Sequence, residues 1–145
     1  MQAAVSTDDL TFVPQPKGIP SYWITERVFG ASGNPVQIRY LVEARESPSV
    51  EQQELAADID RRFLNYFFDA LLLLLPAFRR HIVEQRGQRM YTEEFVLRRL
   101  DVLPISDGGR TGHTFFLRCL SDPRYEFVVA YRGERAVQLR VDRDE

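Results

Sequence analysis

A dense apolar block, Phe63–Phe78, constrains the fold of this chain more than any other feature. Only Asn65, Asp69 and Pro76 interrupt it. Around the block, large apolar residues recur at steps of three and four, which places them on one face of a helix. That stripe consists of Leu55, Ile59, Phe63, Phe67, Leu71, Leu74, Phe78 and Ile82. The spacing therefore predicts a long central helix.

A second apolar row, Leu64, Phe68 and Leu72, follows the same helical spacing beside the first. Because two rows flank each other, we expect the middle of the helix to be buried on more than one side. The block is shorter than the roughly 20 apolar residues that a membrane span needs, and it contains polar residues. The sequence thus predicts a buried core helix and no membrane contact.

Two N-caps compete at the start of this helix. Ser47 precedes Pro48, which is tolerated at the first helical position, and Ser49 has Gln52 three residues later, as in a capping box. Pro76 removes one hydrogen bond of the helical ladder, and its ring clashes with the preceding turn. We expect a kink, or a break into two helices, at or just before Pro76.

Short segments on both sides of the helix alternate between apolar and polar residues, as half-buried strands do. A turn-rich connection of hairpin length joins the first two strands, which predicts an N-terminal antiparallel hairpin. The later strands predict an antiparallel meander. The segments are Tyr22–Phe29, Val36–Val42, Asp101–Ser106, His113–Leu120, Phe127–Arg132 and Val137–Asp142.

Two segments are harder to assign. Thr92–Leu100 fits a short helix capped by Thr92, but its β-branched and aromatic residues also permit a strand; we favour the helix. Residues 1–20 carry three prolines, which cannot donate to a ladder, so we expect an extended arm there. Pro104 should place its strand at an edge or a bulge.

Strands and helices come in blocks along the chain and do not alternate, which favours an α+β fold with helix packed on one face of an antiparallel sheet. The sequence has 145 residues, enough for one domain with a substantial core. We therefore expect an arm over residues 1–20 and a single α+β domain over residues 21–145.

Composition excludes some classes of function. The net charge of −2 argues against a nucleic-acid binder, which needs a concentrated positive surface. Cys119 is the only cysteine, so a disulfide framework is excluded and a reducing compartment is expected. Met1–Leu10 lacks the basic region and apolar run of a signal peptide. We expect a cytoplasmic protein.

No set of residues has the spacing of a catalytic or metal site. His113 and Cys119 share a strand face, but six strand residues span about 20 Å, too far for a nucleophilic pair. The two histidines and one cysteine lack zinc-ligand spacing. Asp69 lies among apolar neighbours, so an arginine from the sheet pairs with it or it faces water. We expect no cofactor, no metal and no enzymatic activity.

The candidate contact surface of a binding protein consists of two polar, charged turns, Asp107–His113 and Asp122–Arg124. Both are expected to be exposed, because loops rich in Gly, Asp and Arg seldom lie in a core. The candidate binding residues are Asp107, Arg110, His113, Asp122 and Arg124.

The final third, Phe115–Val141, with the run Asp122–Val129 and the Gly133-Glu134 turn, resembles the closing hairpin of small bacterial α+β immunity proteins that accompany polymorphic or contact-delivered toxins. The resemblance implies a cytoplasmic, non-enzymatic protein that binds one toxin and blocks it. Two alternatives stay open. One is a small-molecule site or small enzyme between helix and sheet that uses Asp69, tyrosines and arginines. The other is a subunit or chaperone of a larger assembly.

Overall fold

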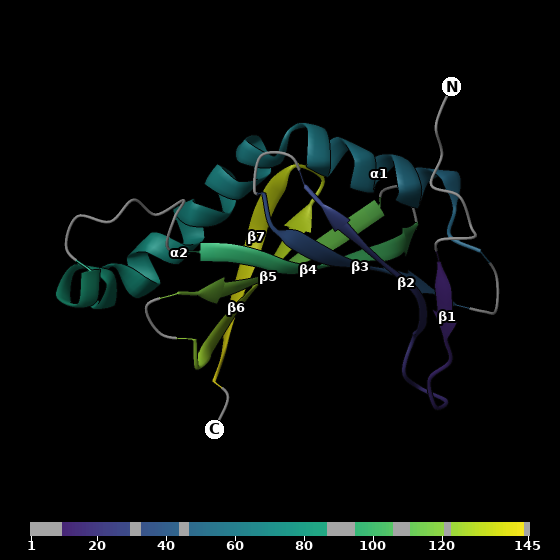
Figure 1. The fold of residues 1–145 in the computed structure, drawn as a ribbon, viewed down its shortest axis with the longest axis horizontal. Coiled ribbons are helices and arrows are strands. Elements are labelled where there is room, and N and C mark those ends of the chain that lie inside the picture. The colour runs from purple at the N-terminus through teal and green to yellow at the C-terminus, as the bar shows by residue number, and fades with distance from the viewer. Residues whose placement is uncertain are drawn as a thin grey trace.

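The computed structural model describes residues 10–29, 33–43, 47–86, 95–105, 111–120 and 123–143, with side chains except at 77–86, 105, 111 and 143. These residues form two helices and one seven-stranded sheet (Figure 1). In chain order the elements are β1 (Thr11–Val13), β2 (Ser21–Val28), β3 (Pro35–Val42), α1 (Val50–Arg61), α2 (Phe63–Arg86), β4 (Phe95–Ile105), β5 (Thr111–Cys119), β6 (Tyr125–Arg132) and β7 (Arg135–Arg143).

The strands lie in the sheet in the same order as in the sequence, from β1 to β7. All neighbours are antiparallel except β3 and β4, which pair in parallel from Gln37 opposite Arg99 to Tyr40 opposite Val102. A parallel pair needs a crossover connection, and α1 and α2 lie within it. The predicted α+β class is confirmed, as a mostly antiparallel sheet with two helices.

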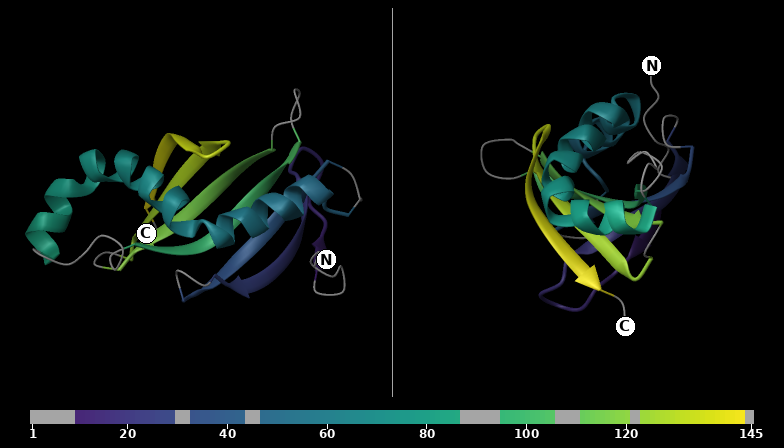
Figure 2. Two further views of the ribbon diagram at one scale, coloured as in Figure 1. Left: turned by 90° about the horizontal axis from the view of Figure 1, so that it is seen from above. Right: turned by 90° about the vertical axis from the view of Figure 1, so that its left-hand side faces the viewer.

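The core lies between the helices and one face of the twisted sheet (Figure 2). Alternate residues of each central strand point toward the helices, because successive side chains of a strand leave on opposite faces. The C-terminal part of α2 extends beyond the strands in Figures 1 and 2. The fully buried large side chains are Phe29, Ile38, Tyr40, Ile59, Tyr66, Phe67, Leu74, Leu97, Leu100, Phe115 and Phe127.

The N-terminal strands differ from the prediction in one respect. β2 and β3 pair along their whole length, from Ser21 opposite Val42 to Val28 opposite Pro35. They are not the first pair of the sheet, because Thr11–Val13 of the expected arm forms β1 and pairs with β2. A proline prevents strand pairing only at its own position, so a strand can form beside it: β1 ends directly before Pro14.

The helix is interrupted at Arg62 and not at Pro76. Arg62 has φ −114° and ψ 36°, outside helical values, and its N–H bonds to the carbonyl oxygen of Asp58. α2 continues through Pro76 to Arg86, along a curved path in Figure 2. Pro76 is exposed, so water can satisfy the carbonyl that it leaves unpaired. The predicted break near Pro76 is therefore wrong in position.

The favoured short helix over Thr92–Leu100 is also wrong, since β4 begins at Phe95. A register shift between Leu97 and Arg99 explains the error. The bulge separates the inward residues Leu97 and Leu100 by three positions, which imitates a helical step. Pro104 lies within a second shift, between Val102 and Ile105, and thus at a bulge as expected.

Candidate functional site

The structure separates the predicted contact residues. Asp107, Arg110 and Asp122 lie outside the described residues. Arg124 is exposed in the turn before β6. His113 is fully buried, so its assignment to an exposed turn is wrong: β5 begins at Thr111, and the pleat turns His113 into the core together with Phe115.

His113 and Arg124 also lie near opposite ends of β5. His113 is opposite Val102 of β4, whereas the other end of β5 places Cys119 opposite Phe95. Six strand residues separate the two ends by about 20 Å. The two described members of the predicted set therefore do not share one surface.

An aromatic box encloses His113. Its ring stacks on Tyr131 with centroids 4.3 Å apart, and Tyr66 meets it edge-on at 5.3 Å. Neither ring nitrogen has a hydrogen-bond partner within the described part of the chain. Burial lowers the pKa of His113 to about 3, which keeps the ring neutral near pH 7. A side chain so enclosed cannot reach a substrate, and Cys119 is equally buried.

Asp58 is the centre of a polar cluster at the junction of the two helices. It accepts hydrogen bonds from Arg61, from Arg62 and, at 2.7 Å, from the hydroxyl of Tyr66. Arg62 also pairs with Glu134 in the β6–β7 turn. The hydrogen bond from Arg62 is the main cause that lowers the pKa of Asp58. Burial, followed by the nearby Asp58, raises the pKa of Tyr66 to about 12.

Two further contacts attach α2 to the β6–β7 hairpin. A carboxylate oxygen of Asp69 accepts the backbone N–H of Ala136 at 2.5 Å, and the hydroxyl of Tyr131 donates to the carbonyl oxygen of Tyr66 at 2.5 Å. Asp69 thus bonds to a backbone group, where we had expected an arginine or water. These contacts hold α2 to the β6–β7 hairpin. Among the described residues, no group of His, Cys, Asp and Glu has the arrangement of a metal site.

The outer face of α2 carries an unexpected apolar row. Leu64, Phe68 and Leu72 are 45%, 50% and 69% exposed, so the expectation that they are buried is wrong. The sheet covers only one side of α2, and no described element packs on the other side. The row therefore faces solvent along three successive positions four residues apart. No described helix is long and apolar enough to cross a membrane.

The face of the sheet away from the helices is lined by paired charges. Arg99 binds the carboxylate of Asp101 at 2.8 Å and covers the ring of Phe116, with its guanidinium carbon 4.0 Å from the centroid. Phe116 is consequently buried although no helix covers it. Arg118 pairs with Glu126, and Arg140 with Asp142. Carboxylates of the chain thus neutralise these three arginines.

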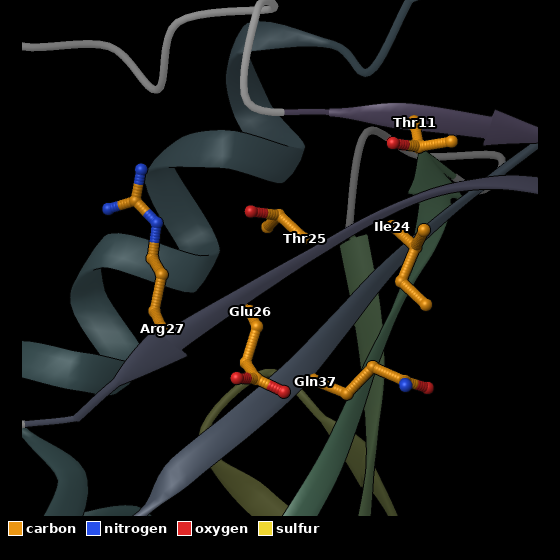
Figure 3. A pocket seen from close by; sticks show the side chains of 6 residues that line it. All are labelled: Thr11, Ile24, Thr25, Glu26, Arg27 and Gln37. Carbon is orange, nitrogen blue, oxygen red and sulfur yellow. The ribbon is translucent and has the colours of Figure 1, made fainter.

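A shallow hollow of about 680 Å³ lies beside β1 and β2, at the edge of the sheet that β1 forms (Figure 3). The side chains of Thr25 and Arg27 lie on one side of β2, and those of Ile24 and Glu26 lie on the other (Figure 3). Thr11 and Gln37 complete the lining.

Comparison with known proteins adds no family: no family model, no curated protein and no solved structure matches this chain significantly.

Proposed function

We propose that this protein is a non-enzymatic protein-binding module that contacts its partner through the outer face of α2. The observation that carries the proposal is the row of Leu64, Phe68 and Leu72, each about half exposed or more. Single exposed apolar residues are ordinary, but a contiguous row of large ones is typical of interaction sites.

The spacing of the row suits a groove or a second helix on the partner. Residues at i, i+4 and i+8 lie on one line of a helix, and this is the arrangement by which amphipathic helices anchor in apolar grooves. Full burial of a Leu or Phe side chain contributes about 1.5–3 kcal/mol. Since these side chains are already partly covered, we expect each of them to contribute about 1 kcal/mol on binding.

The interior favours binding over catalysis. His113 and Cys119 are enclosed, and Asp69 and Asp58 are engaged by groups of the chain itself. The space between α2 and the sheet is filled by apolar side chains such as Phe67. The alternative considered above, a small-molecule site between helix and sheet that uses Asp69, is disfavoured because that carboxylate bonds to the backbone N–H of Ala136.

The narrower form of the proposal is that the partner is a toxin, which this protein neutralises in the cytoplasm. Its support is the resemblance of Phe115–Val141 to the closing hairpin of immunity proteins. A row on α2 also suits a subunit of a larger assembly, and the experiment below distinguishes the two.

The test uses the variants Phe68→Arg and Leu72→Arg, with Ile19→Arg as the matched control. Ile19 is 55% exposed and lies outside α2, so its substitution adds the same charge away from the row. Each tagged full-length protein is used to isolate partners from the native host, and far-UV circular dichroism verifies folding. The wild-type protein and the Ile19→Arg variant should retain the same partner, whereas the two α2 variants should lose it.

A rescue assay tests the narrower form. The wild-type protein and the control variant should protect cells that express the adjacent toxin-like gene, and Phe68→Arg should not. Retention of the partner by both α2 variants would refute the binding surface. A partner that is not toxic when expressed alone would refute the toxin and leave the assembly subunit.

A further inference from the structure

We propose that the outer edge of β7 pairs with the same edge of a second copy of this chain. The two strands run antiparallel, and the two-fold axis of the dimer passes through Val141, so that the two sheets become one. This surface lies at the opposite edge of the sheet from β1. The inference goes beyond the proposed function and does not depend on the apolar row on α2.

The backbone of β7 offers hydrogen-bonding groups at this edge. β7 is the last strand of the sheet and pairs with β6 on one side only, as the right-hand view of Figure 2 shows. In an antiparallel pair, every second residue directs its N–H and C=O away from the neighbouring strand. Ala136, opposite Tyr131, belongs to this outward set, because its N–H bonds to Asp69 of α2.

Two further residues, Leu139 and Val141, belong to the same outward set. β6 pairs with β5 without a register shift, so the alternation along β6 is regular. It continues from the partner of Ala136 to Val129 and Phe127, which lie opposite Leu139 and Val141. Within the described residues, no group of the chain bonds to the outward N–H and C=O of these two residues. A further strand would bind them.

The charges of β7 are self-complementary. Arg140 and Asp142 lie two residues apart on the face away from the helices, where their side chains are 63% and 44% exposed. Two identical edges that pair about a two-fold axis are centred on one residue, because a centre between residues would bring opposite faces together. With the centre at Val141, Arg140 of each copy lies directly opposite Asp142 of the other. The four side chains then alternate in sign around a square, which favours the pairing.

Other centres are less favourable. A centre at Arg140 or at Asp142 places two like charges directly opposite each other, which destabilises the pair. A centre at Leu139 extends the pairing toward Ala136, whose N–H is already bound to Asp69. The centre at Val141 avoids both conflicts. It pairs residues 139–143 of the two copies through about six main-chain hydrogen bonds.

Val141 supplies the apolar part of this interface. It is 45% exposed, although its neighbour on β6, Phe127, is buried. In the dimer the two Val141 side chains lie opposite each other on the helix-covered face and remove apolar surface from water. An edge of five residues buries less than the roughly 1,000 Å² of a stable interface, so we expect a weak dimer that depends on protein concentration.

The first test exchanges the charges. Sedimentation equilibrium of the full-length protein over a range of concentrations should show reversible dimers. Arg140→Asp and Asp142→Arg should each weaken the dimer about tenfold, because like charges then lie opposite each other. The double variant should restore it, and a mixture of the two single variants should form a heterodimer. Arg27→Asp, the same change at an exposed position of β2, is the matched control and should dimerise like the wild type.

The second test removes a backbone donor. The N–H of Val141 points away from β6, so Val141→Pro should leave the fold intact by circular dichroism and abolish the dimer. Phe68→Arg should dimerise normally, which separates this edge from the proposed function. The proposal is overturned if the wild type is monomeric up to about 1 mM, or if the double charge exchange fails to restore the dimer. A folded Val141→Pro variant that still dimerises, or loss of the dimer in Phe68→Arg, would also overturn it.

Discussion

The carboxylate of Asp69 on α2 accepts the backbone N–H of Ala136 on β7, 67 residues away in sequence, at 2.5 Å. β7 is an edge strand with β6 as its only described neighbour. Asp69 thus satisfies a backbone donor that would otherwise depend on water, and it sets the position of α2 over the hairpin.

Substitution of Asp69 by Ala should therefore destabilise the fold. We expect a loss of about 1–2 kcal/mol in the free energy of unfolding, because the bond has a charged acceptor and is only partly buried. Asp69→Asn keeps an acceptor and should lose less. Urea denaturation measures both, with Asp142→Ala as a surface control that should change stability by less than about 0.5 kcal/mol. An Asp69→Ala variant as stable as the wild type would contradict this role.

Two buried tyrosines should respond oppositely to loss of the hydroxyl. Tyr131 donates to the carbonyl oxygen of Tyr66, so Tyr131→Phe should cost about 1 kcal/mol. The hydroxyl of Tyr40 is buried without a partner in the described chain, and Tyr40→Phe removes a polar group that folding leaves unsatisfied. That variant should be as stable as the wild type or up to about 1 kcal/mol more stable. Thermal unfolding of the two variants in parallel is the measurement, and the opposite order would contradict the assignment.

His113 should make the stability of the protein depend on pH in the acid range. Its pKa is about 3 in the folded protein and about 6.5 in the unfolded chain, so the unfolded chain binds the extra proton between these values. The contribution of His113 to the free energy of unfolding therefore rises with pH from about 3 to 6.5 and is constant above that range. We expect a loss of about 2–3 kcal/mol between pH 7 and pH 4.5. The lowered pKa of Asp58 acts mainly below this window.

The variant His113→Phe isolates that effect. It keeps a flat ring against Tyr131 but cannot be protonated, so most of the pH dependence between 4.5 and 7 should disappear. Chemical denaturation at a series of pH values is the measurement. An unchanged slope in this variant would show that other groups cause the acid sensitivity.

Substitution of Gln52 should lower the free energy of unfolding by more than the loss of a helix cap alone. Its Nε2 donates to the carbonyl oxygens of Leu41 and Val102 at 2.8 and 3.2 Å, and its Oε1 accepts the N–H of Ser49 at 2.9 Å. Gln52→Leu would leave these groups unsatisfied and should cost about 2–3 kcal/mol. Ser49→Ala removes only the capping oxygen and should cost about 1 kcal/mol. Equal losses in the two variants would contradict the role of Gln52 as a link between α1 and the ends of β3 and β4.

Periodicity predicted the elements wherever a segment has one clean apolar face. The stripe through Ile59, Phe67 and Leu74 identified the helical region, and of the two competing N-caps the structure has Ser49, in a capping box with Gln52. The alternation in β5 and β6 likewise identified the strands. The second part of β4 was predicted as the strand Asp101–Ser106, but the first part was missed, because an extra residue between Leu97 and Leu100 disrupts the period of two.

Properties that depend on tertiary arrangement could not be predicted. Apolar spacing alone does not show whether a second layer covers Leu64, Phe68 and Leu72, and here no described element does. Alternation placed His113 on the same face as Phe115, but the expectation of an exposed turn overrode it. The candidate site on α2 therefore emerged only from the fold.

The parallel pairing of β3 with β4 has a consequence for the order of assembly. Every other adjacent pair of strands is connected by a short segment, whereas this pair brings together residues about 60 positions apart, such as Gln37 and Arg99. Closing so large a loop costs chain entropy before any contact compensates for it. The β4–β7 meander can form early as a local nucleus, and the contacts between β3 and β4 should form after the transition state, so low φ-values are expected for them.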